Sequence, residues 1–173
     1  LLANVSSYGN YETALRLNLY QIYFPTIEVG VGVCNRHHET TQIHFKTRAP
    51  YLRLGADLNI ARDKQSGNRI FLGLRYGVTS FTFDLTGPPV IDPIWQTRIP
   101  LDYRGQSSTM HWGEFVFGLE AKIWKNFHIG WSGRYRKRIT QRLPAFGQAW
   151  YVPGYGKNSG HVFGGSFNLT FDL

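Results

Sequence analysis

Strict two-residue alternation is the feature that most constrains this chain. It recurs in seven segments, each with apolar side chains on one face and small or polar side chains on the other. This period is typical of β-strands, and helical periodicity is nearly absent. No segment is apolar on both faces, which excludes a parallel sheet covered on both sides. The segments are residues 12–20, 25–34, 51–61, 70–78, 110–124, 127–139 and 161–173.

Two all-β architectures fit this pattern. In a soluble sandwich or lipocalin-like barrel the apolar face forms the core, whereas in a membrane barrel it meets lipid and the polar face fills a narrow lumen. Glycines on the polar face favour the membrane barrel, because Gly weakens a strand unless a bulky neighbour needs the space. The eight glycines on that face are Gly30, Gly32, Gly55, Gly73, Gly77, Gly118, Gly130 and Gly164.

The predicted connections also favour a membrane barrel, because they alternate between short and long. Short turns over residues 21–24, 62–69 and 125–126 suit the periplasmic side, and long loops over 35–50, 86–109 and 140–160 suit the external side. We therefore predict an eight-stranded antiparallel transmembrane β-barrel, formed by residues 1–173 as a single domain. Residues 1–10 are expected to supply the top of an eighth strand and the first outer loop, with the rest of that strand upstream of Leu1.

Composition excludes several other classes of protein. The single cysteine, Cys34, rules out an intramolecular disulfide framework, and no apolar run approaches the roughly 18 residues of a spanning helix. The net charge of +8 suggests nucleic acid, with Arg134–Arg138 as the densest basic run. Alternation, however, places Arg134, Arg136 and Arg138 inside and Lys137 outside, so we expect no nucleic-acid partner.

Four stretches resemble an uncharacterised Bacteroidota family of outer-membrane barrels, catalogued as a domain of unknown function. The resemblance covers nearly the whole chain. It implies an outer-membrane location in a Gram-negative bacterium, and it brings no activity and no catalytic residues. The stretches are residues 43–55 (IHFKTRAPYLRLG), 73–77 (GLRYG), 123–131 (IWKNFHIGW) and 150–158 (WYVPGYGKN).

Six acidic and six basic residues share the predicted inward face. Charges in a narrow lumen must pair or stay hydrated, so we expect an interior ion-pair network that plugs the barrel and prevents general porin activity. A selective ion path would need a wider barrel. The predicted network is Glu12, Arg16, Glu28, Arg53, Asp57, Arg75, Glu114, Glu120, Lys122, Arg134, Arg136 and Asp172.

Aromatic residues near the strand ends predict two girdles at the membrane interfaces. The periplasmic girdle is Tyr20, Tyr23, Phe24, Trp124 and Phe127, and the outer girdle is Trp112, Trp150 and Tyr151. Outer-rim residues are further expected to contact partner proteins or anionic lipopolysaccharide. These contact candidates are Trp95, Lys137, Arg138, Arg142 and Phe146.

Metal binding and catalysis find little support in the sequence. Cys34, His37, His38 and His44 lie near one external loop, but adjacent histidines on an extended segment point in opposite directions. The only acid–base or nucleophile pairs with suitable spacing are His111 with Glu114 and His128 with Ser132, and no motif supports either. We expect no cofactor and no metal.

The sequence therefore favours a non-catalytic accessory subunit of a larger outer-membrane complex. The resemblance to the Bacteroidota family implies a complex of the barrel-assembly or protein-secretion type. The long external loops are rich in Pro and aromatic residues, which suits contact with other outer-membrane proteins or lipoproteins. The alternative is a small barrel that acts alone in surface binding or solute transport, and an outer-membrane enzyme is a third, less favoured class.

Overall fold

The computed structural model describes residues 8–62, 66–91, 94–95, 97–144 and 148–172. These residues form strands and turns, which confirms the all-β prediction, and none of them forms a helix that could cross a membrane. Seven strands make one antiparallel sheet in the order β1-β2-β3-β4-β5-β6-β9, and β7 pairs with β8. The strands are β1 (Tyr8–Arg16), β2 (Tyr23–His37), β3 (His44–Asn59), β4 (Arg69–Ile91), β5 (Arg98–Trp124), β6 (Phe127–Arg142), β7 (Tyr151–Val152), β8 (Gly156–Lys157) and β9 (His161–Phe171).

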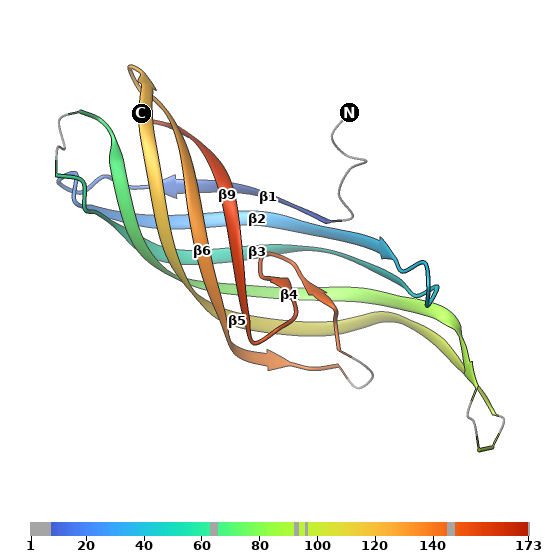
Figure 1. The fold of residues 1–173 in the computed structure, drawn as a ribbon. Coiled ribbons are helices and arrows are strands. Elements are labelled where there is room, and N and C mark those ends of the chain that lie inside the picture. The colour runs from blue at the N-terminus through green and yellow to red at the C-terminus, as the bar shows by residue number, and fades with distance from the viewer. Residues whose placement is uncertain (1–7, 63–65, 92–93, 96, 145–147, 173) are drawn as a thin grey trace.

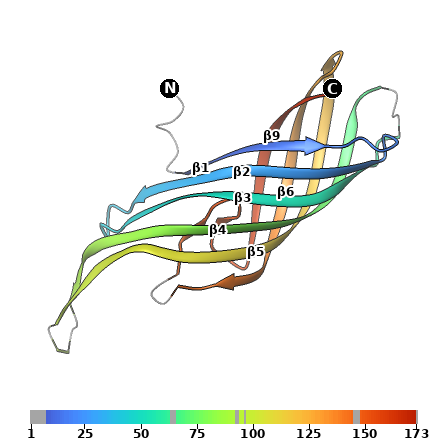
Figure 2. The ribbon, with the colours of Figure 1, turned by 180° about the vertical axis from the view of Figure 1, so that it is seen from behind.

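The sheet is strongly curled, so that β6 and β9 pass across β1 to β3 on the other side of an interior (Figures 1 and 2). Within the described residues β1 pairs only with β2, and β9 only with β6. The result is an open half-barrel, and closure by an eighth strand stays a prediction. Because every pairing is antiparallel, β1 and β9 run in the same direction.

The two ends of the sheet differ in the connections they carry. The "turn end" carries the connections after β1, β3 and β5, including the predicted two-residue turn Lys125–Asn126. The "loop end" carries those after β2, β4 and β6. Here the predicted loops 35–50 and 86–109 are wrong, since strands extend through most of both and leave only residues 38–43 and 92–97 as connections.

The first strand lies earlier than predicted. β1 spans Tyr8–Arg16 rather than residues 12–20, so Tyr8 to Asn10 belong to it and not to an outer loop. The reason is a tight turn in which Tyr20 and Gln21 take positive φ angles of 58° and 56°. The side-chain oxygen of Asn18 accepts the backbone N–H of Gln21 at 2.9 Å and stabilises this turn. Residues 1–7 lie outside the described residues.

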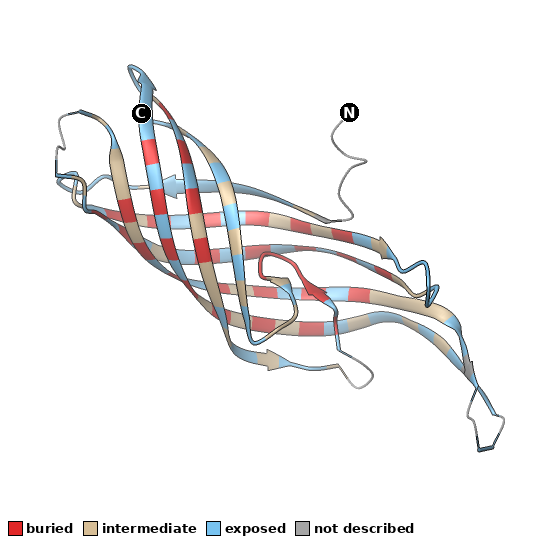
Figure 3. Cartoon of the chain, in the orientation of Figure 1, coloured by how far each residue is buried: buried red, intermediate tan, exposed pale blue. Residues whose placement is uncertain are grey.

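The polarity of the two sheet faces reverses along the strands. In β4, Leu74 and Tyr76 point outward near the turn end while Arg75 is buried; farther along, Ser80 points outward while Phe81 is buried. From Phe71 to Phe83 the odd-numbered residues are the buried ones, so the same positions face inward on both sides of the reversal. Figure 3 shows buried residues alternating with less buried ones along the strands. The aromatic cluster at the loop end comprises Cys34, Phe45, Ala49, Tyr51, Phe81, Phe83, Met110, Trp112, Ala149, Tyr151, Val152 and Tyr155. The strand extensions through residues 35–50 and 86–109 were predicted as loops because their alternation has this opposite polarity.

Inward glycines make room for large side chains of the residues paired with them on the adjacent strand. A Cβ at Gly77 would overlap the indole of Trp112, and one at Gly30 would overlap the phenol ring of Tyr51. Gly77 and Gly30 therefore let these two aromatic rings lie over the neighbouring strand on the inner face of the sheet. The glycine pattern in the sequence thus reports directly on interior packing.

Candidate functional site

The interior half nearer the turn end is filled by a continuous network of ion pairs centred on Arg53. Arg53 Nη1 lies 2.7 Å from Glu12 Oε2 and 3.0 Å from Glu28 Oε2, and its Nε lies 2.9 Å from Glu114 Oε1. Glu28 also pairs with Arg134 at 2.9 Å. The three carboxylates and two guanidiniums that meet here come from five different strands, so the network ties the curled sheet to itself.

Several ion pairs cross the interior between strands that are not neighbours in the sheet, and two of them join β1 to β5 and to β6. Arg16 on β1 lies 2.7 Å from Glu120 on β5, and Glu12 on β1 lies 2.8 Å from Arg134 on β6. Side chains alone span this distance, so the interior is narrow. That width is typical of an eight-stranded barrel whose lumen is filled by side chains.

Among the described residues, eleven of the twelve residues predicted for the network take part in ion pairs, and Lys122 does not. Lys122 pairs with His128 near the end of β5, and its side chain is exposed at the turn end. Its predicted place inside is wrong. The paired residues are Glu12, Arg16, Glu28, Arg53, Asp57, Arg75, Glu114, Glu120, Arg134, Arg136 and Asp172.

Asp172 closes the turn end with two partners that the sequence analysis missed. Arg69 donates hydrogen bonds to both carboxylate oxygens, and His128 Nε2 lies 3.1 Å from Oδ2. The hydrogen bonds from Arg69 lower the pKa of Asp172 below its usual value of 3.8. Arg69 was missed because it is the first residue of its strand, outside the alternating segment.

The connection between β6 and β9 folds into the interior instead of projecting outward as a loop. We call residues 148–160, which contain β7 and β8, the plug. Val152 and Tyr155 are fully buried, and Arg53 Nη2 donates a 2.7 Å hydrogen bond to the carbonyl of Gly154. Arg136 Nη1 donates at 3.0 Å to the carbonyl of Tyr155. Burial also raises the pKa of the Tyr155 hydroxyl above its ordinary value.

The sequence held one indication of the plug. Residues 150–158 combine three aromatics with Pro153, Gly154 and Gly156, a composition that suits a tight folded loop rather than a solvated one. Gly154 has a φ of +78°, and a Cβ there would overlap the ring of Tyr51. Alternation cannot reveal where such a loop packs, which is why it was predicted to face outward.

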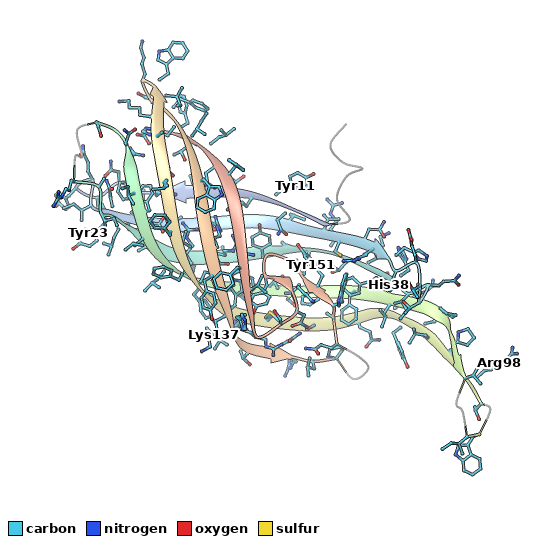
Figure 4. All side chains as sticks on the ribbon, in the orientation of Figure 1. Tyr11, Tyr23, His38, Arg98, Lys137 and Tyr151 are labelled. Carbon is cyan, nitrogen blue, oxygen red and sulfur yellow. The ribbon has the colours of Figure 1, made fainter. Side chains whose placement is uncertain are left out.

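Only part of the predicted aromatic girdles lies on the outer surface. Tyr20, Tyr23 and Trp124 are exposed at the turn end, and Trp150 is exposed at the loop end. Phe127 is half-buried. The girdle prediction is wrong for Phe24 and Trp112, which are buried because their strand positions face inward, and for Tyr151, which is buried because the plug folds into the interior (Figure 4 shows Tyr151).

The five predicted contact residues fall into different environments. Trp95, at the tip of the β4–β5 hairpin, is 78% exposed, and Lys137 and Arg142 are exposed on the outside of β6. Arg138 instead donates to the side chains of Gln141 and Asn158, both at 3.1 Å, so it is engaged with the plug. Phe146 lies outside the described residues.

Neither candidate catalytic pair is brought together. His111 Nδ1 lies 2.8 Å from the Tyr76 hydroxyl on the outer face, whereas Glu114 is buried inside beside the Trp112 indole. The Ser132 hydroxyl contacts that of Ser166 at 3.1 Å rather than His128.

Of the residues considered for a metal site, His37 and His44 are paired on β2 and β3 with ring centroids 6.3 Å apart. Cys34 is buried, and His44 Nε2 lies 2.6 Å from the Asn35 side chain. Within the described part of the chain, no group of three or more His, Cys, Asp and Glu side chains is placed to hold a metal ion.

Comparison with known proteins gives a family but no relative of known activity. No curated protein matches the chain, and no solved structure matches it. The model of one family, described as a domain of unknown function, matches residues 3–172. The chain therefore belongs to the family of the domain of unknown function DUF6048.

Proposed function

We propose that the sheet is the wall of an outer-membrane β-barrel, with its turn-end half in lipid and its loop-end half outside. The observation that carries this proposal is the reversal of face polarity. Near the turn end the exposed face is apolar and the enclosed face carries the ion pairs, the reverse of a soluble protein. In β4 this stretch runs over the nine residues 70–78, close to the roughly 9–11 residues with which a tilted strand crosses a membrane.

The unpaired edges support closure by one further strand. Phe167 and Leu169 on β9 are 85% and 74% exposed, and Leu15 on β1 is 72% exposed, more than the outward Leu and Phe side chains of the inner strands, such as Leu74 at 68% and Phe115 at 46%. Because β1 and β9 run in the same direction, a single strand between them would be antiparallel to both. Such a strand would also cover two open edges, which otherwise promote aggregation.

The proposed role is that of a non-catalytic accessory subunit in a larger outer-membrane complex of the barrel-assembly or secretion type. The filled interior favours a structural role over transport, because the plug and the Arg53 network occupy the space that a solute would need. The β4–β5 hairpin supports a docking role, since it extends beyond the sheet and exposes Ile94 and Trp95 at its tip (79% and 78%; Figure 1). Exposed aromatics of this kind are typical of protein interfaces.

A pull-down tests this role. A tagged copy extracted from membranes in several mild detergents is expected to co-purify a larger barrel or a surface lipoprotein. Trp95→Ser should lose that partner, whereas Trp124→Ser, which changes an equally exposed Trp (74%) at the turn end, should keep it. A lone monomer in every detergent would defeat the subunit proposal and favour the barrel that acts alone.

A further inference from the structure

The outer face carries a shallow groove of about 700 Å³ at the level where face polarity reverses. Its floor is the backbone at Gly113, where a Cβ would meet only the Ile139 side chain at 3.9 Å. Leu74, Tyr76, Phe115, Tyr135 and Lys137 are among the residues that surround it. These side chains point outward. Arg75, Glu114 and Arg138 also line the groove, although the side chains of Arg75 and Glu114 are buried in the ion-pair network on the other face of the sheet.

Register explains why the groove lies at this position. Gly113 pairs with Tyr76 on β4 and with Lys137 on β6, so one position without a side chain lies between an aromatic and a cation. The Tyr76 hydroxyl is held by His111 Nδ1 at 2.8 Å, which fixes one wall. The irregular pairing between His111 and Trp112 leaves Ile139 and Thr140 both exposed on the outside, and Ile139 forms the upper rim.

We infer that this groove binds an anionic phospholipid, with one acyl chain over Gly113 and the phosphate against Lys137. The inference rests on the proposed membrane location. Charge complementarity selects this occupant. β6 runs toward the loop end, so Lys137, labelled in Figure 4, lies beyond Tyr135 on the side where headgroups would be. The apolar side chains of the lining are Leu54, Leu74, Phe115 and Ile139. A Lys at this level attracts anionic headgroups, while a slot without a side chain accepts a chain of methylene groups.

The test uses the purified protein reconstituted into vesicles of phosphatidylcholine with a minor share of phosphatidylglycerol. After gentle transfer to non-ionic detergent, native mass spectrometry counts the retained lipids. We expect phosphatidylglycerol to be enriched over its share in the vesicles. Lys137→Gln should reduce that enrichment about fivefold. Gly113→Leu, which fills the groove, should reduce retention of both lipids about tenfold.

Matched controls keep the test specific. Lys125→Gln removes an exposed Lys at the turn end, and Ala121→Leu enlarges an outward residue of β5 away from the groove. Both should behave as the unchanged protein. Equal losses for Lys125→Gln and Lys137→Gln, or equal retention of the two lipids by the unchanged protein, would overturn the lipid site.

The same experiment separates failure of this inference from failure of the proposed function. Insertion into the vesicles is measured first, by heat-modifiable migration on a gel. A protein that inserts but shows no groove-dependent lipid contradicts only the lipid site. A protein that stays soluble and never inserts contradicts the membrane location and, with it, the lipid site.

Discussion

Arg53 on β3 and Gly154 in the plug are joined by a 2.7 Å hydrogen bond from Nη2 to the carbonyl oxygen, across 101 residues of sequence. The same guanidinium pairs with Glu12, Glu28 and Glu114. One buried cation therefore neutralises three carboxylates and anchors the plug. The interior charges and the folded loop therefore form a single structural unit.

Replacing Arg53 should destabilise the protein strongly. Arg53→Met leaves the buried Glu28 and Glu114 and the partly exposed Glu12 short of a partner, and breaking a buried ion pair costs about 3–5 kcal/mol. The midpoint of unfolding in denaturant, followed by gel migration, measures the loss. Arg104→Met is the control, because the Arg104–Asp102 pair is exposed and should contribute less than about 1 kcal/mol. Equal stability of the two variants would contradict the central role of Arg53.

A side chain at Gly77 should also be costly. Gly77→Val would place atoms inside the indole of Trp112, and overpacking of this kind typically costs about 1–3 kcal/mol. Gly160→Ala, where nothing lies within 4 Å, is the matched control and should be close to neutral. Equal shifts of the unfolding midpoint for the two substitutions would contradict the claim that Gly77 provides space for the Trp112 indole.

Face polarity gives a test of membrane insertion. Leu74 is 68% exposed, so Leu74→Arg would be harmless in a soluble protein, whereas on a lipid face it should cost about 2–4 kcal/mol. Ser80→Arg, farther along the same face and beyond the apolar stretch, should change stability by less than about 0.5 kcal/mol. Folding yields of both variants into lipid vesicles decide between the two environments.

The turn end should respond to acid through Asp172. Its pKa is lowered by Arg69, so the carboxylate stabilises the folded state at pH values above its usual pKa of 3.8. That contribution is lost as the pH falls below 3.8 and through the lowered pKa. Unfolding midpoints measured from neutral to acidic pH should therefore converge for the unchanged protein and Asp172→Asn. A constant difference between them would contradict this.

Conductance should depend on the plug. The unchanged protein is expected to give no large, steady conductance in planar bilayers, because Val152 and Tyr155 fill the loop-end interior. Replacing residues 151–155 with a Gly/Ser segment should produce measurable openings. A large conductance before that replacement would show that the interior is not filled.

Much of the fold and of the ion-pair network follows from alternation alone. Arg53, Arg75, Glu28 and Glu114 occupy the same strand positions as the inward glycines, which is sufficient to place them inside. Alternation also predicts that Trp112 points inward, because it lies two residues before the inward Glu114. The girdle prediction for Trp112 relied on its aromatic side chain instead, and it was wrong.

Other features lay beyond what a local period can report. The plug depends on contacts between residues 148–160 and strands far away in sequence. Arg69 and His128 meet Asp172 only because β4 and β6 begin, and β9 ends, at the same level of the curled sheet. Lys122 is exposed because it lies near the end of β5, and the alternation does not show where along a strand the interior ends.

The constant parity of β4 has a consequence for how this protein tolerates insertions. Odd-numbered residues face inward from Phe71 to Phe83, through both polarity zones. A single-residue insertion near Gly77 would turn every later side chain to the opposite face, exposing Phe81 and Phe83 and burying Ser80 and Thr82. An insertion of two residues would keep each side chain on its face and only lengthen the hairpin. Natural length variation in this strand should therefore occur in even steps.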